Sequence, residues 1–388
     1  MEKVKLREVA KLQGGYAFKS DEFVKGGTPV IKIGNIMDGE ILIDDKITLK
    51  NEEFLRNHPE FIVEKNDILI AMSGATVGKI GRYMNEKVSL LNQRVGKFIV
   101  NNVLKDYLYY ILQSDLFKEY VLSNAFGCAQ PNISGSQIEE FEFCVYDIET
   151  QKSIVEILHR ITIMIDKRKK QLEKLDELIK ARFVELFGDP VINPKSWETA
   201  PLSALILNAN NGMARRGKDA DGSIVLRLVE LQNGFIDYSA PNRICLNETE
   251  KKRYELVDND FLFARVNGNP DYVGRCAVFK GIGEPVFHND HIIRVHFDEA
   301  RINGCFMSVL LNSDYGKRQM REQIKTSAGQ YTISQDGIGA IIAILPPLEL
   351  QNQFAAFVEQ TDKSKLAVQK SLDKLELFKK ALMQKYFE

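Results

Sequence analysis

Apolar residues recur along two segments of the chain with a spacing that predicts long helices. From Ile154 the apolar positions continue at Leu158, Ile161, Ile165, Leu172, Leu175, Ile179 and Leu186. The steps alternate between four and three residues, interrupted at Arg168 and Arg182, a pattern typical of helices that pack along one another. A second segment repeats the pattern at Phe354, Val358, Val368, Leu372, Leu375, Leu382 and Tyr386. At about 1.5 Å per residue, each helix is roughly 55 Å long, which exceeds what one small domain needs for its core.

Two helices at equivalent places favour packing against each other as an internal spacer, whereas a single one would be consistent with a dimerising coiled-coil tail. Gly188 and Pro190 predict the end of the first helix, because both residues are typical just after a helix C-terminus. We expect residues 149–188 and 348–388 to form the two spacer helices. The expected packing positions are Ile154, Leu158, Ile161, Ile165, Leu172, Leu175, Ile179, Phe354, Val358, Val368, Leu372 and Leu375.

The region before each helix combines short apolar runs with turn residues. Residues 68–70 and 97–100 read as buried strands, and Asn233-Gly234 reads as a turn. This mixture predicts an α/β (mixed α+β) domain at residues 1–148 and another at residues 189–347.

The second half of the chain repeats the first at a distance of about 200 residues. Residues 30–33 match 225–228, residues 66–71 match 259–264, and residues 130–134 match 330–334. Because the matches keep their order, we infer an internal duplication with an approximate two-fold axis. A DNA duplex has the same symmetry, so two divergent readers held apart by a rigid spacer would read two different half-sites separated by a gap.

Charge and composition limit the function classes. The formal net charge of the 388 residues is -1, whereas a lone DNA-binding domain is usually basic. We therefore expect basic residues to be concentrated locally and partners to contribute further positive charge. The five cysteines form no Cys-x-x-Cys pair, which opposes zinc knuckles or a disulfide framework. No apolar run is long enough for a bilayer and the start has no apolar signal segment, so we expect a cytoplasmic protein.

Several blocks carry a family resemblance. Residues 4–10 with Gly14-Gly15-Tyr16-Ala17-Phe18-Lys19-Ser20 open the first copy, and Gln130-Pro131-Asn132-Ile133-Ser134-Gly135 lies near its end. Phe187-Gly188-Asp189-Pro190, followed by Asn193-Pro194-Lys195-Ser196-Trp197-Glu198, joins the halves. In order and duplication these blocks resemble the specificity subunits of Type I restriction–modification enzymes. The second copy lacks the Gly-Tyr-Ala-Phe-Lys element, which fits a different target sequence.

The resemblance implies two target-recognition domains separated by two antiparallel helices. It implies a non-catalytic subunit that binds double-stranded DNA at a bipartite site, with no cofactor, metal or membrane. It also implies partners, namely two methyltransferase subunits and the endonuclease/translocase subunits of the full complex.

Three near-matches to catalytic motifs are each incomplete. Residues 74–79 are one residue short of a phosphate-binding loop, and Ile80 follows the lysine where Ser or Thr is needed. Asn269-Pro270-Asp271-Tyr272 resembles the tetrad of adenine methyltransferases, yet no Gly-rich cofactor loop lies upstream. His288-Asn289-Asp290-His291 lacks a third metal ligand at suitable spacing, and its counterpart Leu91-Asn92-Gln93-Arg94 holds no ligand set.

Polar side chains that change between the copies are candidates for DNA contacts. We expect Gln93 and Arg94 in the first domain, and Arg265 and His291 in the second, to contact bases, because such side chains read base edges. Arg215 and Arg216 beside Gly217 suit a phosphate clamp. The full predicted set is Lys19, Asn35, Ser73, Thr76, Lys79, Asn92, Gln93, Arg94, Gln130, Asn132, Arg215, Arg216, Arg265, Asn267, Asn269, Arg275, His288, Asn289, His291, Gln330 and Tyr331.

Two alternatives from other classes stay open. A self-contained methyltransferase or restriction enzyme is opposed by the missing cofactor loop and by insufficient length for catalytic domains besides two readers. A coiled-coil scaffold without DNA contacts would leave the two large α/β regions without a purpose. Binding of a labelled cofactor tests the former, and the salt dependence of binding to random duplex tests the latter.

Overall fold

The computed structural model describes residues 2–19, 21, 23–24, 26–43, 48–49, 52–125, 131–327 and 329–387. Contacts divide the chain into two compact units, Met1–Lys170 with Gln369–Glu388 (unit 1) and Gln171–Val368 (unit 2). Each long helix contributes one part to each unit, so the units do not follow the four consecutive segments of the sequence analysis. Those segment boundaries stay a prediction.

Unit 1 contains two five-stranded sheets, ordered β2-β11-β8-β9-β5 and β3-β6-β4-β10-β7, and the strand pair β1-β12. Its pairs are antiparallel except β4 with β10 and β5 with β9. Its strands are β1 (Glu2–Lys5), β2 (Ala10–Gly14), β3 (Phe23–Val24), β4 (Thr28–Ile31), β5 (Gly39–Glu40), β6 (Thr48–Leu49), β7 (Ile62–Val63), β8 (Ile68–Ala71), β9 (Ile80–Arg82), β10 (Ser89–Leu91), β11 (Val95–Val100) and β12 (Glu142–Val145). Its short helices are α1 (Leu6–Val9), α2 (Glu52–Asn57), α3 (Lys105–Gln113), α4 (Asp115–Ala125) and α5 (Gly135–Glu139).

Unit 2 contains sheets ordered β14-β21-β17-β19, β16-β15-β20 and β18-β23-β22, and the strand pair β13-β24. Only β15 and β20 pair in parallel among its described strands. Its strands are β13 (Glu198–Pro201), β14 (Ile206–Asn211), β15 (Ser223–Leu226), β16 (Arg243–Ile244), β17 (Asp260–Ala264), β18 (Val266–Asn267), β19 (Cys276–Val278), β20 (Val286–His288), β21 (Ile292–Phe297), β22 (Lys325–Ser327), β23 (Gln330–Thr332) and β24 (Ile342–Leu345). Its short helices are α7 (Glu248–Tyr254), α8 (Gly304–Asn312), α9 (Asp314–Gln323) and α10 (Gln335–Gly339).

Equivalent strands β8 and β17 form the centre of each unit, and every residue of both is buried. The same turn precedes each strand, with Asn66 (φ 72°) and Asn259 (φ 69°) in the left-handed region that asparagine tolerates. The next residue, Asp67 or Asp260, accepts a hydrogen bond at 2.9 Å from the backbone N–H three residues earlier. The repeat seen in the sequence is therefore a repeat of local geometry.

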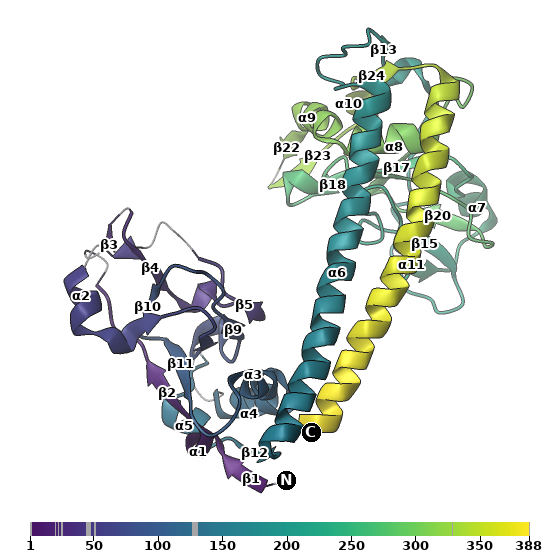
Figure 1. The fold of residues 1–388 in the computed structure, drawn as a ribbon. Coiled ribbons are helices and arrows are strands. Elements are labelled where there is room, and N and C mark those ends of the chain that lie inside the picture. The colour runs from purple at the N-terminus through teal and green to yellow at the C-terminus, as the bar shows by residue number, and fades with distance from the viewer. Residues whose placement is uncertain are drawn as a thin grey trace. The chain divides into compact units, whose positions relative to one another are not determined.

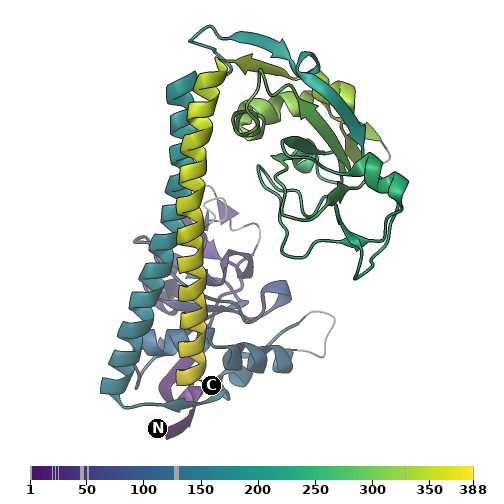
Figure 2. The ribbon, with the colours of Figure 1, turned by 90° about the vertical axis from the view of Figure 1, so that its right-hand side faces the viewer.

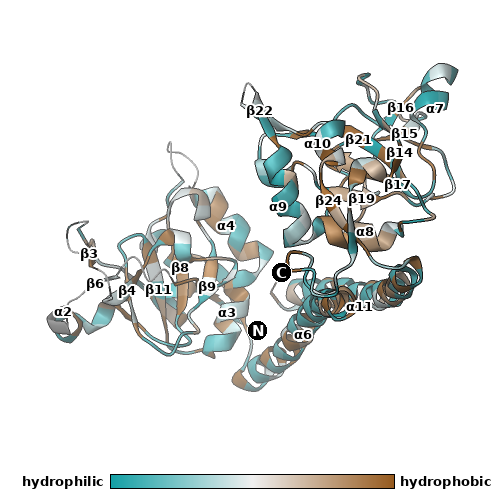
Figure 3. Ribbon diagram, turned by 90° about the horizontal axis from the view of Figure 1, so that it is seen from above, coloured by the Kyte–Doolittle hydropathy of each residue, from teal (hydrophilic) through white to brown (hydrophobic). Residues whose placement is uncertain are grey.

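Hydrophobic residues gather around these strands. In unit 2, Phe261 and Phe263 of β17 pack in one core with Phe306 of α8. Figure 3 shows α8 as hydrophobic, whereas α9 is mostly hydrophilic. Burial against the sheet, rather than helix propensity, is therefore what holds α8 in place.

Two helices of 40 residues, α6 (Ile148–Phe187) and α11 (Leu348–Phe387), lie side by side (Figures 1 and 2). In unit 1 the start of α6, with Ile154 and Leu158, shares a core with Phe387 at the end of α11. In unit 2 the end of α6, with Phe183, shares a core with Phe354 at the start of α11. The helices are therefore antiparallel. The predicted mixed α/β domains and coiled-coil-like helices are confirmed as the fold class.

The expected packing positions are buried to different degrees along the helices. Leu172, Leu175 and Leu375 are half-buried, and the other positions are buried: Ile154, Leu158, Ile161, Ile165, Ile179, Phe354, Val358, Val368 and Leu372. Ion pairs accompany the half-buried stretch, because Lys169 Nζ lies 3.3 Å from Glu376 Oε1 and Lys365 Nζ lies 2.5 Å from Asp176 Oδ1. No helix among the described residues is long and apolar enough to cross a membrane.

Candidate nucleic-acid interface

One edge of each unit is formed by the ends of two parallel strands. In unit 1 the ends of β4 and β10 meet, and Asn92 donates its backbone N–H to Ile31 O at 3.2 Å. In unit 2 the ends of β15 and β20 meet, and Asn289 donates to Leu226 O at 3.0 Å. The residues that follow these strands therefore lie close together at each edge.

The chain after β10 carries Gln93 and Arg94, whose side chains are exposed. Met72, just after β8, donates its N–H to Arg94 O at 3.0 Å and so anchors this loop. Gly15 passes so close that an added Cβ would lie 2.2 Å from Asn92 O. A side chain at position 15 would therefore displace the loop, which explains why glycine is needed there.

Unit 2 repeats these contacts with other side chains. Arg265 donates its N–H to His291 O at 2.8 Å, so Arg265 and His291 occupy the places of Met72 and Arg94. An added Cβ at Gly212 would lie 2.2 Å from Asn289 O, as at Gly15. The two units therefore share the same backbone contacts around this loop, which we call the frame, but present different polar side chains from it.

Cationic side chains of unit 2 converge on Asp290. Arg216 Nη2 lies 2.7 Å from Asp290 Oδ1 and 3.2 Å from His291 Nε2. Arg265 donates from Nη1 to the backbone oxygen of Asp290 at 3.2 Å. Asn267 of β18, two residues after Arg265, pairs with Tyr331 of β23. These predicted DNA-contact residues come from four segments and gather in one region.

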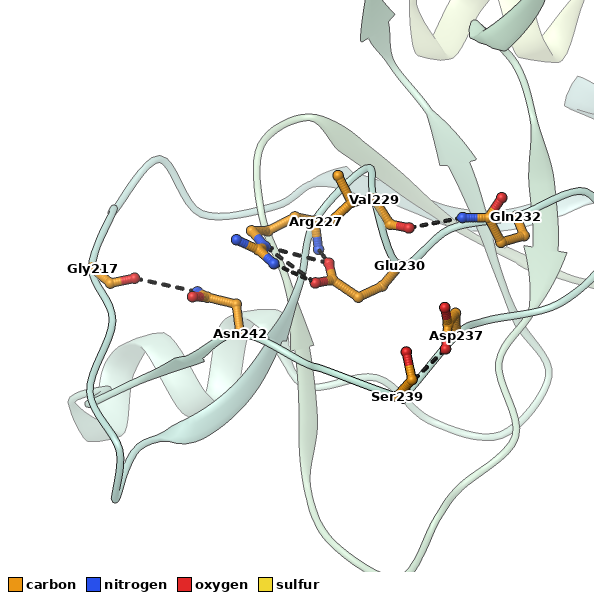
Figure 4. Close-up of polar contacts among 8 residues, drawn as sticks. All are labelled: Gly217, Arg227, Val229, Glu230, Gln232, Asp237, Ser239 and Asn242. Carbon is orange, nitrogen blue, oxygen red and sulfur yellow. Dashed lines mark hydrogen bonds and ion pairs between the residues drawn. The ribbon is translucent and has the colours of Figure 1, made fainter. Parts of the chain in front are cut away.

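Arg227 extends this region, although the sequence analysis did not single it out. It follows β15 and donates from Nη2 at 2.6 Å and from Nε at 3.2 Å to the carboxylate of Glu230 (Figure 4). The Glu230 side chain is 4% exposed and that of Arg227 is 44% exposed, so a buried acid holds an accessible guanidinium. From the sequence alone, this arginine and glutamate, three residues apart, cannot be distinguished from an ordinary exposed ion pair.

Three of the predicted DNA-contact residues have buried side chains, which opposes a direct contact with DNA. His288 is 0% exposed, and its Nδ1 lies 3.2 Å from Tyr254 O. Burial lowers the pKa of His288 to about 4, which keeps the imidazole neutral at physiological pH. Ser73 and Asn289 are also buried, and Asn289 Oδ1 accepts the N–H of His291. All three residues support the frame.

Other predicted residues make structural contacts that limit their reach. Asn35 Oδ1 accepts the N–H of Lys32 at 2.8 Å, and Asn269 Oδ1 accepts that of Asp271 at 3.0 Å. Arg275 donates to Leu231 O and stacks on Tyr272. Thr76 donates to Ile33 O, Asn267 Oδ1 accepts the N–H of Asn269, and Arg215 donates to Glu250. We regard Asn35, Asn269 and Arg275 as supports of their turns.

The remaining predicted residues differ in exposure. Lys19, Gln93, Arg94, Asn132 and Gln330 are exposed, whereas Lys79, Asn92 and Tyr331 are half-buried. Gln130 and Ser20 lie outside the described residues. No group of three or more His, Cys, Asp or Glu side chains that could hold a metal occurs in the described part of the chain.

Internal ion pairs neutralise several of the cations at this edge. Arg215 pairs with Glu250 at 2.8 Å, and Arg216 pairs with Asp290. Exposed ion pairs of this kind contribute about 0–1 kcal/mol, so a phosphate could replace the carboxylate at little cost. The local positive charge expected from the sequence is thus present but partly paired.

Comparisons with known proteins point to one family. Residues 1–177 match the model of the Type I restriction modification DNA specificity domain. The StySPI specificity subunit of a Type I restriction enzyme from Salmonella potsdam is 27% identical over 356 residues, covering 86% of this chain and 74% of the relative. The EcoKI specificity subunit from Escherichia coli (strain K12) is 23% identical over 355 residues, covering 86% and 75%.

Solved structures of similar fold span the whole chain. The S subunit of a Type I restriction-modification system from M. genitalium has a TM-score of 0.59 at 15% identity and covers 100% of this chain and 96% of its own. A structure titled for complex assembly and conformational transition of the type I R-M system has a TM-score of 0.56 at 13% identity, covering 99% and 97%. At these identities the likeness establishes the fold.

Proposed function

The chain belongs to the family of Type I restriction–modification specificity subunits, and we propose from this premise that each of its units reads one half of a bipartite DNA target. The observation that carries the proposal is the pair of equal frames with unequal side chains. Arg94 in unit 1 corresponds to His291 in unit 2, and Gln93 corresponds to Asp290, within the same backbone contacts. Equal frames fit equivalent sites on a duplex, and unequal side chains fit different base sequences.

Among the polar residues that are exposed or half-buried, we propose the exposed Gln93 and Arg94 and the half-buried Arg265 and His291 as base contacts. Arg216 and Lys79 suit phosphates, since either can approach a backbone oxygen as a cation. A good bidentate base contact contributes about 1–3 kcal/mol of discrimination. Arg94→Ala should therefore relax one position of one half-site, whereas equal weakening on all sequences would reassign Arg94 to phosphate.

We propose that the long helices bind two copies of one methyltransferase subunit. Leu178 on α6 and Phe378 on α11 lie 200 positions apart and are 47% and 54% exposed. Single exposed apolar residues are common, but a pair at equivalent places suits two identical partners. Leu178→Ser and Phe378→Ser should each remove one partner copy in native mass spectrometry. Leu207→Ser, at an exposed residue of β14 in unit 2, is the control and should leave the stoichiometry unchanged.

Catalysis, in this proposal, is supplied by the partner subunits in the cytoplasm, where the DNA lies, and endonuclease/translocase subunits join the same complex. The support comes from the sequence, where the near-matches to cofactor motifs are incomplete. Highly purified chain without partners should neither methylate nor cut DNA. Methyl transfer by the chain alone would contradict this.

The direct test of the proposed function is methylation mapping. The chain is produced with its methyltransferase subunits in a host without other adenine methylation, and methylated adenines are located in the genome. The expected result is one bipartite target with two different half-sites and a gap of fixed length. A continuous target, or methylation without sequence preference, would contradict the proposal.

A further inference from the structure

The turn after β15 fixes a guanidinium group at the edge of unit 2. Glu230 Oε2 accepts the backbone N–H of Arg227 at 2.7 Å, and the same carboxylate accepts hydrogen bonds from Nη2 and Nε. Asp237 donates its N–H to Glu230 O at 2.8 Å, which ties the turn to the returning chain. The turn is therefore fixed at the backbone of Glu230, and its buried carboxylate orients Arg227 (Figure 4).

A guanidinium group has two edges that can donate pairs of parallel hydrogen bonds. The edge formed by Nε and Nη2 faces Glu230. The other edge, formed by Nη1 and the second N–H of Nη2, remains, and Nη1 has no hydrogen-bond acceptor among the residues that the structure describes. Two parallel donors of this kind match O6 and N7 of guanine in the major groove.

A second arginine in the same unit shows the opposite arrangement. Arg243 donates from Nη1 and from Nη2 to Glu284, at 3.0 and 2.9 Å, and Nη1 also donates to Gly222 O. The edge of Arg243 formed by Nη1 and Nη2 is therefore already occupied by Glu284. Arg243 provides a matched control, because it is also a partly exposed arginine paired with a glutamate.

Unit 1 uses the same turn with a different cation. Lys32 donates its N–H to Asn35 Oδ1 at 2.8 Å, as Arg227 does to Glu230, and its ammonium lies 4.5 Å from the centre of the Phe23 ring. Lysine is a point charge without a planar fork. The turn therefore keeps its geometry while its recognition chemistry changes between the two units.

We propose that Arg227 reads a guanine in the half-site bound by unit 2, with Glu230 as its positioning residue. The position of Arg227 suits this role. Leu226 pairs with His288, so Arg227 lies beside Asn289 and the loop that carries His291. Fixing the arginine before binding lowers the entropy cost of the contact. This inference rests on the proposed function, in which unit 2 reads one half-site.

The test measures methylation by the complex of the full chain with its methyltransferase subunits. The substrates are duplexes in which each half-site position carries each of the four bases in turn. Arg227→Lys, which keeps the charge opposite Glu230, should reduce the preference for guanine at one position of one half-site by on the order of 10- to 100-fold. Arg243→Lys should leave every preference unchanged.

The positioning role of Glu230 is tested by its effect on the guanine preference that Arg227 provides. Glu230→Gln should weaken the same guanine preference by a smaller factor, because glutamine can accept only with one oxygen. In the Arg227→Lys background it should change the preference no further. The variant Arg227→Ala with Glu230→Gln removes both charges together, avoids an unpaired buried acid, and should match Arg227→Lys in specificity.

Each outcome decides the inference. Unchanged preferences in a folded Arg227→Lys complex, equal weakening on all sequences, or a wild-type half-site without a dependent guanine would overturn it. The proposed function is tested separately, because it fails only if the wild-type complex does not recognise two half-sites. Folding of each variant is checked by the fluorescence of Trp197, the single tryptophan, which packs on the core of unit 2.

Discussion

His288 shows how a single residue can differ between the copies for structural reasons. It occupies the place of Leu91 at the end of equivalent strands, and both side chains are buried. A buried histidine with a pKa of about 4 takes up a proton on unfolding when the pH lies between about 4 and about 6.5, the usual pKa in the unfolded chain. Unit 2 therefore loses stability as the pH falls from about 6.5 towards 4.

His288→Leu tests this linkage, since leucine is the residue that unit 1 already uses. The wild type should lose on the order of 3 kcal/mol more unfolding free energy than the variant across that pH range. Urea unfolding at pH 7.5 and pH 4.5, followed by Trp197 fluorescence, gives the two values for unit 2. All other titrating groups are common to both proteins, so an equal pH dependence would contradict the assignment.

At this scale the sequence predicts the type of residue better than its exposure. The polar run 288–291 reads as a surface loop, yet its first two side chains are buried by β20 pairing with β15 and by contact with Tyr254. Arg227 was missed because its partner Glu230 is buried by the fold of the turn. Both facts depend on contacts between segments that are distant in sequence.

At the scale of elements, the junction of α6 and α11 in unit 2 is an aromatic cluster. Phe354 is 0% exposed, and its ring lies 5.5 Å from that of Phe183 and 5.4 Å from that of Phe187. Edge-on contacts at these distances add to the burial of apolar surface. The cluster therefore anchors the start of α11 to the end of α6 within unit 2.

Phe354→Ala should lower the unfolding free energy of unit 2 by about 3–5 kcal/mol, because it leaves a cavity among large rings. Leu366→Ala, at a residue of α11 in unit 2 that is 58% exposed, should change it by less than about 0.5 kcal/mol. Trp197 fluorescence in urea reports both, since its Nε1 donates to Phe187 O at 2.9 Å. Similar losses in both variants would show that the cluster does not anchor the helix.

The positions of the two long helices could be predicted closely from the sequence, whereas the pairing of strands into sheets could not. The alternation of three and four residues located α6 and α11 because a helix face is set by local spacing. The parallel pairing of β4 with β10 and of β15 with β20, which creates the candidate interface, joins strands far apart in sequence. Short apolar runs do not specify their partners, so this edge emerges only from the structure.

For the whole molecule, we expect the long helices to set the gap between the half-sites, since each continues without a break from one unit into the other. Four residues inserted after Leu175, with a matching insertion after Leu375, add about one turn or roughly 5.4 Å to each helix. At about 3.4 Å per base pair the gap should grow by one to two base pairs, with both half-sites kept. Duplicating residues 172–175 keeps the insert compatible with a helix. Methylation mapping with an unchanged gap in an active complex would show that the helices do not set it.

The central claim, that the two units read different half-sites independently, is tested most directly by exchanging residues 1–148 for those of a relative with a known target. The chimera is produced with its methyltransferase subunits, and methylated adenines are mapped across the host genome. One half-site should change to that of the relative, while the other half-site stays as in the wild type. A change in both half-sites, or in neither, would contradict the account.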